Sequence, residues 1–378
     1  SIAKHLNAAG IVVREKLSIG DDRTQIVEAV GRAMSASEIT VITGGLGPTK
    51  DDITKKTLAE MFRSEMRYDQ RVAGHVEKML AERGIETSDE WIRTRTGIGC
   101  RHIASEGQTT LSLAVDATRD ALTRGNIDPQ TIDLIIVATT TPDGLFPSMA
   151  CRLQNALGIK GCAAFDVQAV CAGFVYAMSV ADGLIRTGGY KRALVVGAEV
   201  LSRLLDWNDR TTCVLFGDGA GAVVIEACER EGILAHRMHA DGSFGVDTLA
   251  CDARIENGKI AGDPFIQMNG RQVFKLAVSS LSESFVEVCG MAGIAPSEVD
   301  VWVPHQANIR IIEMIADKLG IPKEKTVETV QMHGNTSAAS VPLALDWAVK
   351  NGRIHEGDTV MLQGVGAGMT WGSVLLKW

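Results

Sequence analysis

The sequence has no excess of basic residues, no long hydrophobic run and no closely spaced pair of cysteines. Its 38 Lys and Arg residues are outnumbered by 46 Asp and Glu residues, which gives a formal net charge of −8. A chain with this balance has no general positive field to hold a nucleic acid. The longest uncharged stretch of interest, residues 167–181, is too short and too rich in small and polar residues to span a bilayer. We therefore expect neither a nucleic-acid partner nor a membrane partner.

The cysteines and the first residues of the sequence narrow the class of protein further. None of the eight cysteines has the CxxC spacing of a zinc knuckle or a redox dithiol, so no metal site is expected. No positively charged leader precedes an apolar segment, and we expect a cytoplasmic protein with reduced thiols. At 378 residues, 46% of them hydrophobic, the chain is longer than one compact core usually requires, which predicts at least two structural units.

Residues 1–85 predict alternating helices and strands. An apolar stripe of helical spacing begins after Asp22, and residues 39–43 form a short β-branched run that is typical of a buried parallel strand. That run leads into the glycine-rich turn 44–47 and a further helix. Such a turn can receive phosphate because free backbone N–H groups point outward there, but it lacks the Lys-Ser ending of a P-loop. A purely structural role for the turn is equally open.

Residues 87–378 contain an internal repeat. Residues 127–137 match residues 294–304 in residue type and order, and each stretch continues through a loop and a helix to the tripeptide Leu-Gly-Ile. We therefore expect two copies of one α/β unit. In such sheets the chemistry lies beyond the carboxyl ends of the strands, which here places it at the seam between the copies.

Three side chains of different chemistry fall at this seam. Cys171 begins a helix that is apolar or small almost all round, which predicts burial, and the positive end of that helix is expected to favour the thiolate. Taken singly, Cys171 would more often be a packed core residue, and His305 and Asn335 would more often be ordinary loop residues. Because the repeat brings all three together, they suit a nucleophile faced by two hydrogen-bond donors. A Cys-His-Asn protease shares these residue types, but neither the apolar Cys helix nor the His-Gly-Asn context is typical of one.

Several specific motifs follow one another through the second part of the chain. They are Thr-Ser-Asp-Glu-Trp (87–91), Thr-Arg-Thr-Gly-Ile (94–98), Phe-Asp (165–166), Cys-Ala-Gly-Phe (171–174), Phe-Gly-Asp-Gly-Ala-Gly-Ala (216–222), His-Gln-Ala-Asn (305–308), His-Gly-Asn-Thr-Ser-Ala-Ala-Ser (333–340) and Thr-Trp-Gly (370–372). Through them, residues 87–378 resemble the β-ketoacyl-acyl-carrier-protein synthase III family of the thiolase superfamily. The resemblance implies an α/β fold of duplicated, thiolase-like layers (αβαβα), with halves at residues 86–230 and 231–378.

The resemblance also implies a ping-pong reaction that initiates fatty acid synthesis. Cys171 would take an acyl group, expected to be acetyl, from acyl-CoA, with the backbone N–H groups of Cys171 and Gly368 as the oxyanion hole. His305 and Asn335 would then donate hydrogen bonds to the thioester carbonyl of malonyl-acyl-carrier protein while carbon dioxide leaves. The resulting carbanion would attack the acylated Cys171. Acyl-CoA is a substrate in this scheme, so no cofactor and no metal are expected.

Binding roles are implied for further residues. Trp91 and Arg210 would sandwich the CoA adenine, and Thr87 would bond its edge. The pantetheine tunnel would be lined by Gly270, Phe274, Ala307 and Asn308. The family is dimeric, so a homodimer is expected in which Phe146 reaches the partner's acyl pocket. Docking of the acidic carrier protein would fall to a basic patch of Lys275, Arg310 and Lys318.

The first part of the chain resembles a different family. Thr-Gly-Gly-Leu-Gly-Pro-Thr-Lys-Asp-Asp-Ile-Thr (43–54), with shorter stretches before it, is similar to the competence-damage-inducible (CinA) family. The resemblance implies that residues 1–85 are a truncated α/β segment of the molybdopterin-binding type. That family's ADP-ribose pyrophosphatase activity would draw on Asp51 and Asp52, but the family's opening strand and second half have no match here.

The synthase resemblance is also incomplete, because the strand that opens that family has no match before Thr87. We expect the missing strand to be a central one, whose loss would leave buried backbone groups unpaired. We hypothesise that residues 38–43 take its place. The chain then has the pattern of a fusion of two truncated genes, for which three functions stay open. These are an active condensing enzyme, a catalytically impaired fusion that dimerises or binds CoA only, and an ADP-ribose pyrophosphatase.

Overall fold

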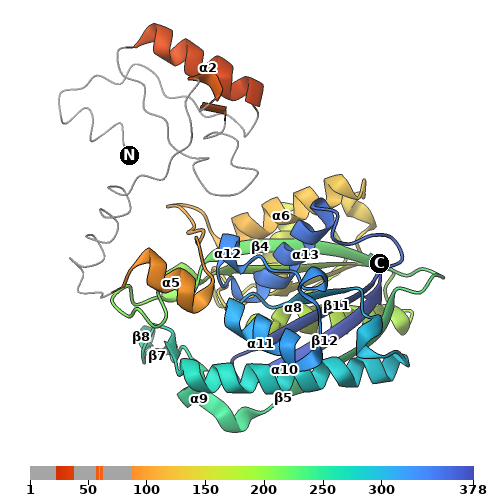
Figure 1. Ribbon diagram of the computed structural model, residues 1–378. Helices are drawn as coiled ribbons and strands as arrows, with labels where there is room; N and C mark the ends of the chain where they lie inside the picture. The colour runs from red at the N-terminus through yellow and green to blue at the C-terminus, as the bar shows by residue number, and fades with distance from the viewer. Residues whose placement is uncertain (1–22, 38–56, 59, 63–86) are drawn as a thin grey trace. The chain divides into compact units, whose positions relative to one another are not determined.

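The computed structural model describes residues 23–37, 57–58, 60–62 and 87–378 (Figure 1). The chain divides into two compact units, residues 1–75 and residues 76–378. In the first unit, α2 (Arg23–Ala36) begins directly after Asp22 and buries two residues of the apolar stripe, which confirms the predicted helix. The strand proposed at residues 38–43, the glycine turn, Asp51 and Asp52 lie outside the described residues.

The second unit contains two four-stranded sheets. The first has the order β2-β1-β3-β4, in which β1 is parallel to both of its neighbours and β4 is antiparallel to β3. Every residue of β1 is buried, as its unbroken run Leu-Ile-Ile-Val-Ala requires of a parallel strand covered on both faces. The strands are β1 (Leu134–Ala138), β2 (Ala163–Val167), β3 (Arg192–Val200) and β4 (Asp218–Glu226).

The second sheet has the order β10-β11-β12-β5. Strand β10 is parallel to β11, whereas β12 is antiparallel to both β11 and β5. The chain leaves the first sheet at Glu226 and enters the second at Ile233, on either side of the boundary expected at residue 230. The strands are β5 (Ile233–Ala240), β10 (Val301–Pro304), β11 (Thr359–Gly366) and β12 (Thr370–Lys377).

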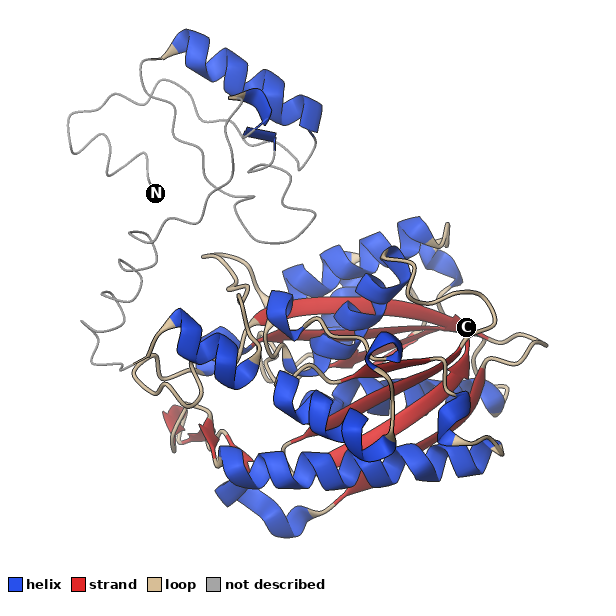
Figure 2. Ribbon diagram, viewed as in Figure 1, coloured by secondary structure: helices blue, strands red, loops and turns tan. Residues whose placement is uncertain are grey.

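Helices cover both sheets and fill the space between them, as Figure 2 shows. One apolar core joins α8 (Gly173–Arg186) and α13 (Ser340–Lys350) to the facing sides of both sheets. A second core packs α6 (Thr110–Arg124) and α7 (Met149–Ala156) on the outer face of the first sheet, and a third packs α10 (Gly270–Ala292) and α11 (Ile309–Leu319) on the second. The layer order is therefore αβαβα, which confirms the predicted fold class.

Shorter elements connect these layers. They are α5 (Asp89–Thr96), α9 (Gly245–Thr248), α12 (Val330–His333), β6 (Leu249–Ala250), β7 (Arg254–Glu256), β8 (Lys259–Ala261) and β9 (Gln267–Met268). The repeated Leu-Gly-Ile tripeptide ends a helix in each copy. Gly158 has a φ of 69° after α7, and Gly320 has a φ of 67° after α11. Because the left-handed region favours glycine, the repeat is a helix stop signal in both halves.

The position expected for the missing strand was wrong. Strand β1 pairs directly with β3, Leu134 opposite Ala193, so the first sheet has no central gap. In the second sheet the opening strand of the repeat, β5, lies at the edge beside β12. By the same order, the counterpart in the first half belongs at an edge, beside β4. An edge position is less demanding, because solvent can satisfy edge groups where it cannot reach a central strand.

The outer edge of β4 is unpaired within the described part of the chain. Asp218 turns its N–H away from β3 and donates it to the carbonyl of His102 at 2.8 Å. Since these directions alternate along an antiparallel strand, Ala220, Ala222 and Val224 also turn their backbone groups away from β3. Residues 38–43 lie outside the described residues, so their pairing with this edge stays a hypothesis.

Candidate active site

Cys171 lies in a tight turn that joins the first sheet to the buried helix α8. The 3₁₀ turn Val170–Ala172 holds it, and its side chain is 3% exposed. Strand β11 of the other half packs directly against this turn. A Cβ atom added at Gly366 would lie 2.6 Å from the Cys171 nitrogen. Only glycine allows so close an approach, which explains the glycine-rich end of β11.

Burial determines the protonation state of the Cys171 thiol. Loss of water is the main cause that raises the pKa of Cys171 to about 12; the Ser337 hydroxyl acts against this rise, and the Glu199 charge adds to it. The expectation that the helix end would favour a thiolate therefore does not hold for the resting site. Burial of the charged sulfur outweighs the helix dipole, and the resting group is a neutral thiol.

His305 follows β10, and its backbone is held by the neighbouring strand β11. Its N–H donates to the carbonyl of Gln363 at 2.8 Å, and its Nδ1 lies 2.5 Å from the Ser340 hydroxyl. Burial lowers the pKa of His305 to about 3, so the imidazole is neutral at pH 7. The Gln306 N–H points at the same Ser340 oxygen at 3.4 Å. In the tautomer in which Ser340 accepts from Gln306 and donates to Nδ1, the ring proton lies on Nε2 as a hydrogen-bond donor.

Asn335 is fixed through both its backbone and its side chain. Its N–H donates to the Leu215 carbonyl and its carbonyl accepts from the Gly217 N–H, each at 2.9 Å. Its Oδ1 accepts the N–H of Ser337 at 3.0 Å. With the oxygen occupied, the Nδ2 group of the carboxamide is the part left to donate to a substrate.

Two serines of one motif bring the three candidate residues together. Ser337 bonds Asn335 through its N–H, and its hydroxyl acts on the Cys171 sulfur. Ser340, three residues later at the start of α13, bonds His305. The structure therefore places a thiol, an imidazole donor and a carboxamide donor around residues 337–340, as the repeat predicts.

Trp91 and Arg210 form a stacked pair beside this region. The Arg210 guanidinium carbon is 5.3 Å from the centre of the Trp91 ring. An aromatic base between two planar groups needs about 7–8 Å, twice the carbon–carbon contact distance, so Arg210 has to move outward to admit one. The Thr87 hydroxyl is buried without a hydrogen-bond partner in the described part of the chain, as a group that awaits a ligand would be.

The residues expected to line the pantetheine tunnel lie on or beside α10 and α11. Gly270 is the first residue of α10, and Phe274 packs one turn later on the apolar core of that layer, as does Ala307. Asn308 caps α11 through its side chain, which accepts the Arg310 N–H at 2.9 Å. These placements are compatible with a tunnel wall, and the binding roles stay predictions.

Gly368 was expected to supply an N–H to the oxyanion hole. It lies in the turn between β11 and β12 with a φ of 129°, and a side chain there would meet Thr370. Two other glycines of the same run pack on the turn that holds Cys171: Gly366 on the Cys171 nitrogen and Gly364 on Ala172 and the Cys171 carbonyl. Their signal was present in the sequence as the run Gly-Val-Gly-Ala-Gly (364–368), but spacing alone did not say which glycines make the contact. The oxyanion role of Gly368 stays a prediction.

The remaining predicted residues are exposed. Phe146 is 83% exposed, next to Leu145 at 77%. Lys275 on α10 and Arg310 and Lys318 on α11 are exposed on two helices that pack together, and within the described residues none of them forms an ion pair. An exposed pair of large hydrophobic side chains is compatible with a contact surface, and so are three exposed basic side chains that form no ion pair among the described residues.

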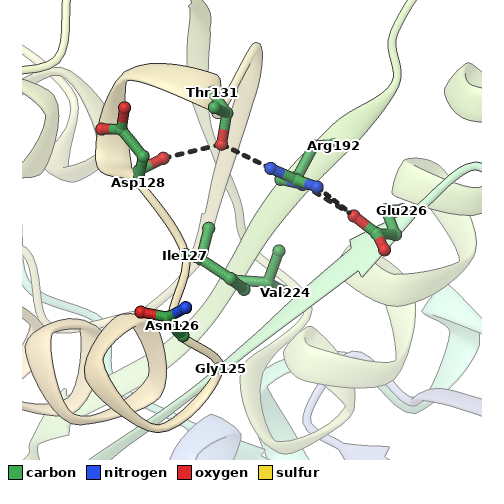
Figure 3. Close-up of a pocket in the computed structure, with 8 residues that line it drawn as sticks. All are labelled: Gly125, Asn126, Ile127, Asp128, Thr131, Arg192, Val224 and Glu226. Carbon is green, nitrogen blue, oxygen red and sulfur yellow. Dashed lines mark hydrogen bonds and ion pairs between the residues drawn. The ribbon is translucent and has the colours of Figure 1, made fainter.

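A hollow of about 450 Å³ lies elsewhere on the first sheet (Figure 3). Ile127 and Val224 face each other in it, beside the ion pair of Arg192 with Glu226, whose closest atoms are 2.5 Å apart. Val224 belongs to the open edge of β4. No lining residue of this hollow contacts Cys171, so it is separate from the candidate site.

Comparisons with known proteins agree with this geometry. Residues 165–242, which include Cys171, match the model described as 3-oxoacyl-[acyl-carrier-protein (ACP)] synthase III, and residues 289–378, which include His305 and Asn335, match the model of its C-terminal part. The 3-oxoacyl-[acyl-carrier-protein] synthase III from Aquifex aeolicus VF5 is 49% identical, with 78% of this chain and 92% of that chain covered and a TM-score of 0.72. This chain belongs to the 3-oxoacyl-acyl-carrier-protein synthase III family. It is a condensing acyltransferase of the fatty acid synthesis type.

Two further solved structures are similar to this chain. The synthase III from Pseudomonas aeruginosa PAO1 is 40% identical, with 80% of this chain and 93% of that chain covered and a TM-score of 0.74. The priming β-ketosynthase of the R1128 polyketide pathway is 36% identical, with 80% and 91% covered and a TM-score of 0.75.

A second family model matches the beginning of this synthase III chain. Residues 1–137 match a probable molybdopterin binding domain, as the sequence resemblance implies for the first 85 residues. In the structure, residues 110–137 of that match form α6 and most of β1 in the synthase fold. Among the described residues, no helix is long and apolar enough to cross a bilayer, and no cluster of three His, Cys, Asp or Glu side chains could hold a metal.

Proposed function

We propose that this chain is an active initiating condensing enzyme with acetyl-CoA as its acyl donor and malonyl-acyl-carrier protein as its acceptor. The observation that supports this most strongly is the convergence of Cys171, His305 and Asn335 through the two serines of residues 337–340. One acyl-accepting sulfur with two neutral donors is what a decarboxylating condensation needs.

In the first step the Cys171 sulfur attacks the acyl-CoA thioester. The S–acyl bond to CoA breaks, an S–acyl bond to Cys171 forms, and the thiol proton leaves on the CoA sulfur. Because one thioester replaces another, the step is close to balanced in energy. The glycine-rich end of β11 against the Cys171 nitrogen lets a backbone N–H approach the oxyanion of the tetrahedral intermediate.

In the second step the malonyl thioester loses carbon dioxide. The breaking C–C bond leaves its electron pair on the carbon next to the thioester, and the negative charge is shared with the carbonyl oxygen. Nε2–H of His305 and Nδ2–H of Asn335 are the donors for that oxygen. Both are neutral and fixed in place, and removal of one such donor typically raises the barrier by about 3–4 kcal/mol.

In the third step the carbanion attacks the acyl group on Cys171. A C–C bond forms, the bond to the Cys171 sulfur breaks, and the sulfur leaves as a thiolate that takes up one proton. The high pKa of Cys171 makes that reprotonation favourable, so the enzyme returns to its resting thiol.

The partners follow from the exposed residues of the site region. Phe146 is the residue we expect to reach across a homodimer, because with Leu145 it presents two adjacent exposed hydrophobic side chains, as a contact surface does. We propose that the carrier protein, an acidic partner, docks on Lys275, Arg310 and Lys318.

The test is product formation by the full chain. Acetyl-CoA and malonyl-acyl-carrier protein should together give carbon dioxide and a 3-ketoacyl-carrier protein, and neither substrate alone should do so. Folded protein that binds CoA yet gives no product would favour the catalytically impaired fusion. Release of AMP from ADP-ribose, lost in Asp52→Ala, would favour the pyrophosphatase.

A further inference from the structure

Glu199 is a buried carboxylate near the end of β3, a strand whose other buried residues are apolar. Its side chain is fully buried. An isolated carboxylate in such a place is strongly unfavourable unless hydrogen bonds replace its water shell. The residues that follow β1 supply them: Thr141 donates its hydroxyl at 2.5 Å, and Thr140 donates its N–H at 3.1 Å and its hydroxyl at 3.0 Å. All of these donors are neutral.

One more donor reaches Glu199 from the other copy of the repeat. The Ser337 hydroxyl lies 3.1 Å from Oε1 of Glu199. Glu199 therefore links two strand ends of the first sheet to the motif that carries Asn335. Sequence reasoning passed over this residue, although a lone acid inside the run Ala-Leu-Val-Val-Gly-Ala-Glu-Val (193–200) is a signal that something polar faces it.

Ser337 is the residue through which Glu199 meets the site. Its φ of 49° is uncommon for a residue other than glycine, so neighbouring contacts must hold it. The same Ser337 orients the Asn335 carboxamide with its N–H at 3.0 Å. Its hydroxyl also acts on the Cys171 sulfur.

Glu199 and Cys171 compete for the one hydrogen bond that the Ser337 hydroxyl can donate. A serine hydroxyl has a single hydrogen to donate. While that hydrogen is given to the Glu199 carboxylate, the Ser337 oxygen can only accept from the thiol, which keeps Cys171 protonated. The negative charge of Glu199 acts in the same direction, because like charges oppose ionisation.

We infer that Glu199 is a positioning residue of the condensing site, which acts through Ser337 to orient Asn335 and to hold Cys171 as a thiol. The part concerning Asn335 rests on the proposed function, whereas the part concerning the thiol does not. Glu199 touches no substrate in this account.

No other charged group competes for this role among the described residues around the sulfur. Strands β11 and β12 place Gly366 and Thr370 against the turn that holds Cys171, and neither side chain titrates in the accessible range. His305, the other titratable member of the site, is neutral because burial lowers its pKa to about 3. Burial raises the pKa of Glu199, and its hydrogen bonds from Thr141, Thr140 and Ser337 act against that rise. In its ionised form, Glu199 is the charge that raises the pKa of Cys171.

The first test is the rate of Cys171 alkylation by iodoacetamide at pH 8, read peptide by peptide by mass spectrometry. Glu199→Gln removes the charge and leaves a weaker, neutral acceptor for the Ser337 hydroxyl, so the rate should rise about tenfold, as for one unit of pKa. Glu199→Asp keeps the charge and should stay near the wild-type rate. Ser337→Ala leaves the threonine donors of Glu199 in place and removes the oxygen that accepts from the thiol, so alkylation should not slow. A slower rate would show that Ser337 donates to the sulfur and would overturn the inference, which keeps the test open if Glu199→Gln fails to fold.

Two controls separate this effect from general loosening. Asp166→Asn removes another carboxylate of the same sheet, one that accepts the N–H groups of Met149 and Ala150 and has no contact with Ser337. Cys289, buried on α10, serves as an internal control in every variant. An equal rise in Asp166→Asn, or a parallel rise at Cys289, would overturn the inference, as would an unchanged Cys171 rate in Glu199→Gln.

The second test addresses Asn335 through malonyl decarboxylation. Glu199→Gln and Ser337→Ala should each slow carbon dioxide release about 100-fold, the loss expected from a small misplacement of a catalytic donor. If Glu199 acts through Ser337, the double variant should be no slower than the slower single variant. Multiplied losses would contradict the inference. Absence of decarboxylation in the wild type would instead reject the proposed function and leave the alkylation result standing.

Discussion

The Ser340 hydroxyl lies 2.5 Å from Nδ1 of His305, and both groups are buried. When the Ser340 hydroxyl donates in this contact, the proton of the neutral imidazole lies on Nε2. In that tautomer His305 is an uncharged donor toward the substrate side. Ser340 begins α13, a helix of the central layer, so the rigid core of the fold sets the chemistry of the ring.

Ser340→Ala should therefore slow malonyl decarboxylation while it spares transfer of the acyl group to Cys171. Without the hydroxyl, the Nδ1 tautomer becomes available and the donor is lost for part of the population. We expect at least a tenfold decrease in carbon dioxide release, measured beside Cys171 acylation. Ser282→Ala, which removes a buried hydroxyl bonded to Val278 on α10, is the matched control and should leave both steps unchanged.

Asn335→Ala should separate the two half-reactions more sharply. We assign its Nδ2 group to the malonyl carbonyl and to no part of the acylation step, so Cys171 acylation should persist while decarboxylation falls about 10²- to 10³-fold. Rapid-quench measurement of each half-reaction checks this. Equal loss of both steps would mean that Asn335 supports the site as a whole and does not stabilise the developing charge.

Trp91→Ala should weaken the binding of acyl-CoA more than the binding of malonyl-carrier protein. The Trp91 ring is one face of the expected adenine site, and the carrier protein has no adenine. The apparent KM for acetyl-CoA should rise several-fold with a smaller change for the second substrate. Trp378→Ala is the control: it removes another exposed tryptophan, the last residue of the sequence, and should change neither value. The opposite ranking would show that the adenine lies elsewhere.

Acid should destabilise the fold through His305. Its pKa is lowered to about 3 by burial, so the folded state binds this proton less readily than the unfolded chain. The stabilisation is fully present above the ordinary histidine pKa near 6.5 and is lost as pH falls toward 3. Urea unfolding between pH 7 and pH 5 should show a fall in the free energy of unfolding, to which each such histidine adds about 1.4 kcal/mol per pH unit. His305→Asn should reduce that slope; an identical slope would show that His305 is accessible to protons in the folded state.

Much of the fold could be predicted because the repeat is written in the residue types themselves. The matching stretches 127–137 and 294–304 predicted two similar sheets, and the helix stops at Gly158 and Gly320 confirm the repeat in the backbone. Strand order could not be predicted, because a strand's length and apolar character do not say which edge it joins. The missing strand was therefore expected at the centre, although β5 shows that its place is an edge.

The three principal site residues could be predicted, but their supporting contacts could not. Cys171, His305 and Asn335 were visible because each follows a strand or a repeat landmark. Glu199 and Ser340 act through neighbours that lie more than thirty positions away in the sequence, so no local pattern points to them. The prediction that Cys171 is a thiolate was wrong for the same reason. The pKa of its thiol depends on burial, which is a property of the packed fold and not of a helix end alone.

The most direct test of the account is transfer of label from radioactive acetyl-CoA to the protein. We predict one stable acetyl group per chain, on the Cys171 peptide, released by malonyl-acyl-carrier protein and abolished in Cys171→Ser. Folded wild-type protein that takes up no label, or label that persists in Cys171→Ser, would contradict the central claim that this sulfur is the acyl acceptor.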